Sequence, residues 1–367
     1  MPTAHAAIIT EANSPFTIET ITVDPPQAGE VLVDIRAVGI CHTDLALATG
    51  AFGTQFPAVL GHEGAGVVEA IGEGVTKVKP GDKVLLTFNS CGECARCRAD
   101  DPSYCEHFVP LNLACMREDG STRLHRDGAA VSGNFFGQSS FASKAVAHQR
   151  NVVKLADDAD LATLAPLGCG IQTGAGAVMR SLAAQPGQSL AVIGGGAVGL
   201  SALLGGKLCG CAPIIVIEPN ESRRLLATEL GADHVIDPAD GDAAEAVRRV
   251  VPSGVDLVVD TSGHLPAMIS ALGFIASKGK LGLVGVPAVS DATLPMPVFQ
   301  WLTLGGTVRG IVEGDSDPDA FLPELIAYHA AGRLPFDKFV SYYPFEQINQ
   351  AVADIHSGKS IKAVLTL

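Results

Sequence analysis

Four cysteines, Cys91, Cys94, Cys97 and Cys105, follow one another within a short stretch of this 367-residue chain. Four thiolates at this spacing can surround one ion as a tetrahedron, and zinc prefers this closed set of ligands in structural sites because no position is left for water. An iron–sulfur cluster is the competing interpretation, although its usual motif has a closer fourth cysteine followed by proline. Four unrelated cysteines in a turn-rich loop are the remaining alternative. The spacing therefore predicts a structural zinc site.

A glycine-rich turn, GGGAVG at residues 194–199, lies between an apolar run at 189–193 and an apolar helical stretch at 200–207. A glycine-rich packing turn would explain the glycines alone, but their position between a strand and a helix is typical of dinucleotide binding. Gly194 permits the tight turn, Gly196 lets the backbone approach the pyrophosphate, and Gly199 lets the helix pack on the strand.

The next apolar run, 214–218, ends in Glu218. An acidic residue at this place accepts hydrogen bonds from the adenosine ribose, and its charge repels a 2′-phosphate. We therefore expect NAD to be preferred over NADP. Arg223 and Arg224 lie close enough in the sequence to weaken this expectation.

Three short segments combine metal-ligating residues with glycine or helix signals: Cys41-His42-Thr43-Asp44, Gly61-His62-Glu63 and Gly168-Cys169-Gly170. A mixed set of cysteine and histidine suits a catalytic zinc with three protein ligands and one open position. No spacing rule joins the three segments, and a lone Cys or His beside an apolar run is commonly a packed core residue. The residues alone leave both interpretations open.

The elements that must position these groups change character along the chain. Residues 1–170 combine apolar or alternating runs, at 30–38, 65–71 and 83–87, with turn signals, which indicates β structure. From about 171 to 310, apolar strands alternate with helical patterns, which indicates a parallel sheet covered on both faces. The strands are expected at 189–193, 214–218, 234–236, 255–260 and 280–286, followed by helices near 323–331 and 345–356 and a last strand at 363–367.

Composition narrows the class of protein. The chain is 47% hydrophobic and 17% charged, which indicates a folded protein, and its length favours two domains. A net charge of −14 without a basic cluster disfavours a nucleic-acid partner. The odd count of nine cysteines indicates metal ligands, and the N-terminus has no signal-peptide pattern, so we expect a cytoplasmic protein with no membrane partner. Residues 181–206 are uncharged, but their glycines favour a buried strand–turn–helix over a membrane span.

In this order, the signals closely resemble the zinc-dependent medium-chain alcohol dehydrogenases over essentially the whole chain. The resemblance rests on GHEGAGVVEAIGEGV, the four-cysteine segment, GCGIQTGAG, GGGAVG and the closing GKSIKAVLTL. It implies an α/β fold in three segments: a GroES-like β-barrel catalytic domain with both zinc sites (1–170), a Rossmann doubly wound parallel sheet that binds NAD (171–310), and a return segment that completes the catalytic domain (311–367). It also implies two zinc ions per chain, one catalytic and one structural, and a homodimer or homotetramer.

Carried over position by position, the resemblance assigns roles to single residues. Cys41, His62 and Cys169 are expected to hold the catalytic zinc, Glu63 to approach it during ligand exchange, and Asp44 to orient the zinc-bound histidine.

Other matching residues are expected at the substrate and the cofactor. Thr43 would take the proton of the alcohol, His42 and Lys362 would lie near the pyrophosphate, Thr173 and Val198 would press on the nicotinamide ring, and Arg223 would lie at the adenosine ribose. Ala46 stands where many members have a histidine that ends a proton relay, so the proton would leave from Thr43 through the ribose or through His42.

The substrate pocket is expected to contain Phe52, Thr87, Phe135 and Phe136, and GNFFGQSSFASKA resembles the aryl-alcohol (benzyl-alcohol) dehydrogenase branch. Aromatic rings beside a planar substrate gain on the order of 1 kcal/mol per pair beyond area burial. We therefore expect these phenylalanines to form an aromatic wall for a flat benzylic alcohol. The alternative is that they fill the interface between the two domains.

The resemblance implies transfer of a hydride between a primary, aryl or allylic alcohol and NAD, reversible with the aldehyde. A geraniol-type terpenoid alcohol dehydrogenase and a general aliphatic alcohol dehydrogenase are alternatives within the family. A catalytically silent module that binds zinc and dinucleotide is an alternative of another class, and the complete set of zinc ligands disfavours it. The quinone-reductase branch lacks both cysteine sets, and the glutathione-dependent formaldehyde branch has an acidic residue where Phe52 stands.

Overall fold

The computed structural model describes residues 1–289 and 291–367, and the side chain of Phe52 lies outside the described part. The chain forms two compact units. The first, called here the catalytic unit, comprises Met1–Cys169, Asp317–Ile326 and Asp337–Leu367. The second, called here the dinucleotide unit, comprises Gly170–Ser316 and Ala327–Phe336.

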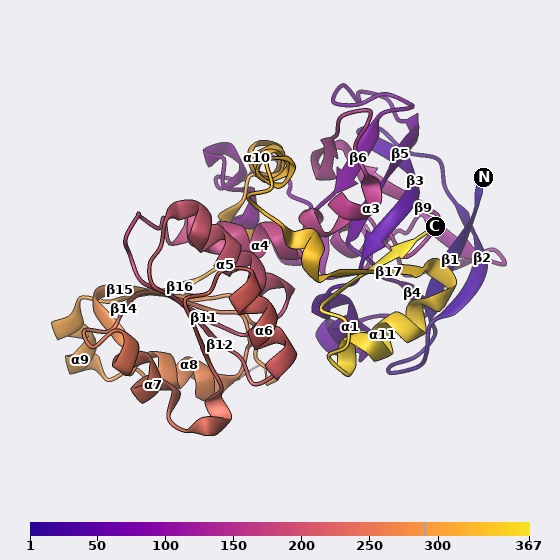
Figure 1. Ribbon diagram of the computed structural model, residues 1–367. Helices are drawn as coiled ribbons and strands as arrows, with labels where there is room; N and C mark the ends of the chain where they lie inside the picture. The colour runs from indigo at the N-terminus through magenta and orange to yellow at the C-terminus, as the bar shows by residue number, and fades with distance from the viewer. Residues whose placement is uncertain (290) are drawn as a thin grey trace. The chain divides into compact units, whose positions relative to one another are not determined.

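A seven-stranded sheet forms the framework of the catalytic unit, and its central strand is β3 (Glu30–Gly39). Antiparallel neighbours of β3 are β5 (Glu63–Ile71), β9 (Lys144–His148) and β18 (Lys362–Thr366). The sheet continues with β6 (Lys83–Leu86) and β10 (Val152–Lys154) beyond β5, and with β17 (Val340–Pro344) beyond β18. In Figure 1 the yellow C-terminal segment therefore runs among the indigo strands. The last strands of the chain therefore complete a sheet whose central strand, β3, comes from the N-terminal part of the chain.

A second, five-stranded sheet of the catalytic unit has the order β4-β1-β2-β7-β8. Its strands are β1 (Thr3–Ile9), β2 (Thr17–Val23), β4 (Ala58–Val59), β7 (Leu124–Arg126) and β8 (Ala129–Val131). The core between the sheets is built from fully buried side chains such as Ile8, Ile35 and Phe141. Helices α1 (His42–Ala48), α2 (Phe108–Asn112), α3 (Leu161–Leu164) and α11 (Ile348–His356) belong to this unit, and α10 (Pro318–Ala330) extends from it into the other.

The dinucleotide unit contains a six-stranded parallel sheet with the order β13-β12-β11-β14-β15-β16. The strands are β11 (Leu190–Ile193), β12 (Ile214–Ile217), β13 (His234–Ile236), β14 (Val255–Asp260), β15 (Ile275–Leu283) and β16 (Thr307–Gly310). All residues of β11 and β12 are buried, as expected for strands covered on both faces. The strand order reverses beside β11, and in open α/β sheets ligands bind at such a switch point.

The described residues of this unit include the helices α4 (Gly170–Gly176), α5 (Ala197–Cys209), α6 (Glu221–Glu229), α7 (Ala243–Val250), α8 (Leu265–Ala271) and α9 (Val298–Leu304). Helices α5 to α8 lie around the strands in Figure 1. Helix α5 starts directly at the glycine-rich turn that follows β11, so the turn lies at the switch point.

The second domain boundary differs from the expected one. The sequence predicts that all of 311–367 returns to the catalytic domain, whereas 311–316 and Ala327–Phe336 pack with the dinucleotide unit. For 311–316 the reason is a close backbone contact, because a Cβ on Gly176 would lie 2.4 Å from the carbonyl oxygen of Gly314. This contact holds the segment after β16 against α4.

Among the described residues, no single helix is both long enough and apolar enough to span a membrane. The bent pair Leu161–Gly168 and Gly170–Ser181 meets both requirements only when its two members are taken together.

Candidate active site

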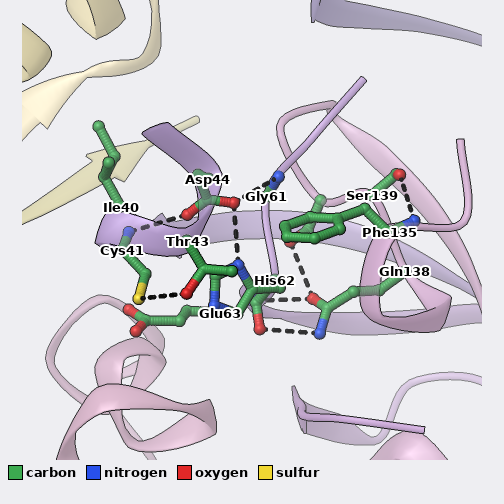
Figure 2. A network of polar contacts seen from close by, with 12 residues as sticks. Ile40, Cys41, Thr43, Asp44, Gly61, His62, Glu63, Phe135, Gln138 and Ser139 are labelled. Atoms are coloured by element: carbon green, nitrogen blue, oxygen red, sulfur yellow. Dashed lines mark hydrogen bonds and ion pairs between the residues drawn. The ribbon is translucent and has the colours of Figure 1, made fainter. Parts of the chain in front are cut away.

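The Asp44 carboxylate, fully buried in the first turn of α1, joins two of the three segments that carry the predicted ligands of the catalytic zinc. Its Oδ2 accepts a hydrogen bond from the backbone N–H of Cys41 at 2.8 Å, and its Oδ1 accepts one from the N–H of Gly61 at 3.0 Å. The same Oδ1 lies 2.9 Å from Nδ1 of His62 (Figure 2). Because a carboxylate can only accept, Nδ1 of His62 is the donor, and the lone pair of the imidazole is on Nε2.

Nε2 of His62 is buried and has no hydrogen-bond partner. The ligand atoms of Cys41, His62, Glu63 and Cys169 all lie within 4.8 Å of one another. A buried imidazole nitrogen without a partner is costly, and a metal ion bound between nitrogen and thiolates removes that cost. Two sulfurs and one imidazole nitrogen are also a ligand set that catalytic zinc sites use. The residues therefore fit the catalytic zinc, and the structure brings the three expected ligands together.

Glu63 forms a buried ion pair with Lys362, whose Nζ lies 2.7 Å from Oε1 and 2.9 Å from Oε2. The ammonium also donates to the carbonyl of Ile40 at 3.2 Å. Burial raises the pKa of the Glu63 carboxyl, and Lys362 partly counters this effect. The structure thus places the Lys362 ammonium on Glu63, next to the zinc ligands. Its expected contact with the pyrophosphate stays a prediction.

Phe135 and Phe136 pack on the imidazole of His62. The Phe136 ring stacks on it with centroids 4.4 Å apart, and the Phe135 ring meets it edge-on at 5.1 Å. Phe135 is fully buried and Phe136 is 4% exposed. The rings therefore pack behind an expected zinc ligand, and their expected contact with substrate stays a prediction. The expectation for the ring of Phe52 lies outside the described residues.

Thr87 is also fully buried, and its hydroxyl donates to the carbonyl of Gly168 at 2.8 Å. This bond fixes the backbone directly before the zinc ligand Cys169. Thr87 is thus placed where it supports a ligand, and its expected contact with substrate stays a prediction.

Sequence reasoning missed Gln138, which holds the His62 segment in place. Its Nε2 donates to the carbonyls of His62 at 2.9 Å and Thr87 at 3.1 Å. Its Oε1 accepts from the N–H of Gly64 at 3.1 Å and from Oγ of Ser140 at 2.9 Å (Figure 2). All four bonding positions of this buried amide are used. A lone amide inside the apolar segment FFGQSSF was the available signal, since buried amides need partners.

Thr43 and His42 occupy the first turn of α1 with different exposure. Thr43 is half-buried, and its Oγ1 lies 3.7 Å from the sulfur of Cys41, so it is adjacent to the zinc ligands. His42 is exposed. The roles expected for Thr43 in proton transfer and for His42 at the cofactor stay predictions.

The four cysteines expected to bind structural zinc lie together, with all sulfurs within 4.8 Å of one another. Backbone N–H groups point at these sulfurs: Cys94 donates to Cys91 at 3.2 Å, Cys91 to Cys105 at 3.3 Å, and Cys97 to Cys94 at 3.5 Å. Hydrogen bonds from the backbone of Cys97 and Glu106 lower the pKa of the Cys94 thiol to about 6. Four sulfurs in this arrangement fit a closed, tetrahedral structural zinc site.

The glycine-rich turn has the shape that a dinucleotide requires. Gly194 has φ of 96°, and a Cβ on Gly199 would lie 1.8 Å from the Gly194 carbonyl oxygen, so both positions need glycine. Gly196 faces open space and begins α5 without a side-chain cap. The first N–H groups of a 13-residue helix are therefore accessible to a phosphate.

Two residues expected at the nicotinamide lie close to this turn. Helix α4 packs so tightly on α5 that a Cβ on Gly174 would lie 2.0 Å from the carbonyl oxygen of Val198. The preceding residue, Thr173, is buried and donates to the carboxylate of Glu313 at 3.3 Å. Thr173 and Val198 are thus brought together in one unit, and their contact with the nicotinamide ring stays a prediction.

Glu218 is 4% exposed, and both of its carboxylate oxygens accept backbone hydrogen bonds. Gly195 donates to Oε2 at 2.5 Å and Asn220 donates to Oε1 at 2.8 Å. The charge at the end of β12 is therefore fixed in position beside the glycine-rich turn. Arg223, in α6, has a buried Nε without a hydrogen-bond partner.

Comparison with known proteins agrees with this geometry. The alcohol dehydrogenase GroES-like domain matches residues 27–157, and the zinc-binding dehydrogenase domain matches residues 197–327. A geraniol dehydrogenase from Castellaniella defragrans is 47% identical over 364 residues, which are 99% of this chain and 97% of the relative. The chain belongs to the zinc-dependent medium-chain alcohol dehydrogenases. The predicted α/β fold class, with a GroES-like domain and a Rossmann domain, is confirmed.

Solved structures support the same family membership. A zinc-binding-domain alcohol dehydrogenase from Burkholderia ambifaria has a TM-score of 0.98 and 44% identity, with 100% of this chain and 99% of that chain covered. The benzyl alcohol dehydrogenase from Acinetobacter calcoaceticus has a TM-score of 0.97 and 38% identity, and both chains are fully covered. This alcohol dehydrogenase is an oxidoreductase that uses zinc and NAD and acts on a small-molecule alcohol, as the sequence predicts.

Replacing Asp44 by Asn should weaken the catalytic zinc selectively. The amide would turn an N–H towards one of three donors, which disorients His62 and the N–H of Cys41. Loss of such an outer partner typically costs about 10- to 100-fold in metal affinity. The number of zinc ions that stay bound to each chain is measured as a chelator is added. In the variant, one of the two zinc ions should be lost at a lower chelator concentration than in the wild type. Asp354→Asn, another buried carboxylate, is the control, and equal zinc affinity in the two variants would contradict the role of Asp44.

Replacing Gln138 by Met should destabilise the protein because it removes the hydrogen bonds that Gln138 makes to the carbonyl of His62 and to the N–H of Gly64, and one of those to the carbonyl of Thr87. Each buried unsatisfied group costs about 1–3 kcal/mol, so we expect a loss of roughly 2–5 kcal/mol. Denaturant unfolding measures it, and Gln350→Met, at an exposed amide of α11, should cost less than about 1 kcal/mol. A Gln138→Met variant as stable as Gln350→Met would show that the network has no stabilising role.

Proposed function

We propose that this enzyme oxidises primary alcohols whose carbinol carbon is bonded to an sp² carbon, which includes benzylic and terpenoid allylic alcohols, and that it does so in the cytoplasm. The cluster of Cys41, His62 and Cys169, backed by aromatic rings, carries the alcohol-dehydrogenase chemistry. The choice of alcohol is supported by two relatives, a geraniol dehydrogenase at 47% identity and a benzyl alcohol dehydrogenase at 38%. Geraniol and benzyl alcohol share the feature that the proposal names.

The chain's own residues divide the work of the reaction. When bound, zinc supplies a Lewis acid for the alcohol oxygen and NAD accepts the hydride. Asp44 keeps the proton of His62 on Nδ1, so that Nε2 faces the two sulfurs. Thr43 offers its hydroxyl beside Cys41 as the first acceptor of the alcohol's proton. Phe135 and Phe136 keep water away from the imidazole.

The cysteines support the proposed location. The described structure contains no disulfide among them, and Cys41, Cys169 and the four-cysteine cluster are placed to act as metal ligands. Thiolate ligands stay reduced in the cytoplasm, where glutathione and thioredoxin act, whereas oxidising compartments favour disulfides.

Matched substrate pairs test the proposed alcohol class. Geraniol and citronellol differ by the double bond next to the carbinol carbon, and benzyl alcohol and cyclohexylmethanol differ by the aromaticity of the ring. A neighbouring π system conjugates with the carbonyl as it forms, so each unsaturated alcohol should have a kcat/KM about 10-fold or more above its saturated partner, equivalent to about 1.4 kcal/mol. Steady-state oxidation with NAD measures this. Equal kcat/KM within both pairs would contradict the proposed substrate class.

We further propose that the chain forms a homodimer, or a homotetramer built from that dimer, through the edge of the parallel sheet. Among the strands of the described residues, β16 pairs with β15 and forms the edge of the parallel sheet. Near it, the side chains of Val298, Phe299 and Leu302 on α9 are 72–79% exposed. A second copy related by a twofold axis can pair with β16 and cover this apolar surface, because such an interface uses the same patch on both subunits.

Phe299→Asp should therefore lower the oligomeric state, since it places a charge in the apolar surface of the proposed interface. Light scattering coupled to size-exclusion chromatography should give the mass of two or four chains for the wild type and a smaller mass for the variant. Leu225→Asp, on the exposed face of α6, is the matched control and should keep the wild-type mass. A monomeric wild type, or equal masses for wild type and Phe299→Asp, would contradict the proposed interface.

A further inference from the structure

The sequence leaves one question open at the adenosine end of the dinucleotide site. Glu218 disfavours a 2′-phosphate, whereas the nearby Arg223 and Arg224 could attract one, because an arginine beside the ribose is how NADP is accommodated. We propose that Asp237 decides this competition in favour of NAD by neutralising the positive charge of Arg224. The proposal rests on a dinucleotide bound at the glycine-rich turn.

Glu218 and Asp237 stand at the carboxyl ends of neighbouring parallel strands. Glu218 follows β12 and Asp237 follows β13, and the N–H of Glu218 donates to the carbonyl of Ile236 at 3.0 Å. Ligands of open α/β sheets bind at this end of the strands. Both carboxylates therefore belong to the edge of the sheet where the ribose is bound.

Arg224 extends from α6 towards these strand ends, and its Nη1 is surrounded by three acceptors. The carbonyl oxygens of Glu218 and Pro219 lie at 2.8 and 2.7 Å, and Oδ2 of Asp237 lies at 2.8 Å. The side chains of Arg224 and Asp237 are 17% and 19% exposed, so the pair is largely shielded from solvent. The positive charge of Arg224 is thus neutralised in the protein itself.

Asp237 is well suited to hold this arginine because its two oxygens have separate tasks. Oδ1 accepts a hydrogen bond from the N–H of Ala239 at 2.9 Å and caps the short helix Pro238–Asp240. Oδ2 remains for Arg224. The cap fixes the orientation of the carboxylate, and the carboxylate fixes the arginine.

A 2′-phosphate on a ribose held by Glu218 would therefore approach two carboxylates and an arginine that is already paired. Without the charge of Asp237, Arg224 would keep its bonds to neutral carbonyls, and its positive charge would become available to the phosphate. The energy of such a pair at short range is large enough to change affinity by an order of magnitude. The NAD ribose, which has a hydroxyl at this position, should gain little.

Asp237→Asn separates the two tasks of the side chain, because the amide oxygen can still accept from Ala239 while the charge is removed. We expect the dissociation constant of NADP to fall about 10-fold and that of NAD to change less than about 3-fold. Isothermal titration of the zinc-loaded enzyme with each dinucleotide measures both constants without turnover. In Asp237→Asn/Arg224→Ala the gain for NADP should disappear.

Asp242→Asn is the matched control, since Asp242 caps α7 in the same way, with Oδ1 2.7 Å from the N–H of Ala244. It should leave both dissociation constants unchanged. An unchanged affinity of Asp237→Asn for NADP, or an equal gain in the double variant, would overturn the role of Asp237. A wild type that binds NAD but favours NADP would overturn the proposed selectivity, whereas one that binds neither would contradict the dinucleotide site itself.

Discussion

The burial of the Asp44 carboxylate is the constraint on which the catalytic centre depends. A charge with no exposed surface is tolerated only when hydrogen bonds replace the lost water, and Asp44 receives them from Cys41, Gly61 and His62. Two of these three donors belong to residues that ligate the metal. Satisfying the carboxylate therefore also sets the distance between Cys41 and His62 and the tautomer of the imidazole. The same contacts stabilise the fold and prepare the zinc site.

The sheet of the catalytic unit supplies the surroundings that this carboxylate needs. Strand β3 leads directly into the Cys41 segment, β5 begins at Glu63, and β18 brings Lys362 from the far end of the chain. Gly39 shows how closely these strands approach one another, because a Cβ there would lie 1.9 Å from Oε2 of Glu63. Lys362 balances the charge of Glu63 in this crowded interior. Thr87 and Gln138 then fix the backbone beside Cys169 and His62.

The sequence predicts best those features that depend on local pattern. The first five strands of the parallel sheet fall close to their expected positions because apolar β-branched runs between turns are a strong signal, although β15 starts earlier than expected, at Ile275. Strand β16, at the edge of the sheet, was not predicted. Helix α10 starts at Pro318 instead of 323, because the first turn of a helix tolerates proline and a second proline, Pro323, is accommodated inside. The spacing of the cysteines predicted the four-cysteine cluster, and the position of the glycines between a strand and a helix predicted the glycine-rich turn.

Features that depend on long-range contacts were predicted less well. The catalytic ligands come from three distant segments, so the family resemblance was needed to join them. The resemblance gave no sign that the ring of Phe135 packs edge-on against His62. The partners of Lys362, Gln138 and Asp237 lie in other segments of the chain, and the periodicity of the sequence does not predict such contacts. Residue type shows that a buried amide or charge needs a partner, but the fold decides which partner it has.

Zinc K-edge X-ray absorption of the purified enzyme, combined with elemental analysis, tests most directly whether Cys41, His62 and Cys169 hold a metal separate from the four-cysteine cluster. We expect two zinc ions per chain and an average first shell of about three sulfurs and one nitrogen or oxygen per zinc, because one site has four sulfurs and the other has two. One zinc per chain with a shell of four sulfurs would contradict the catalytic site.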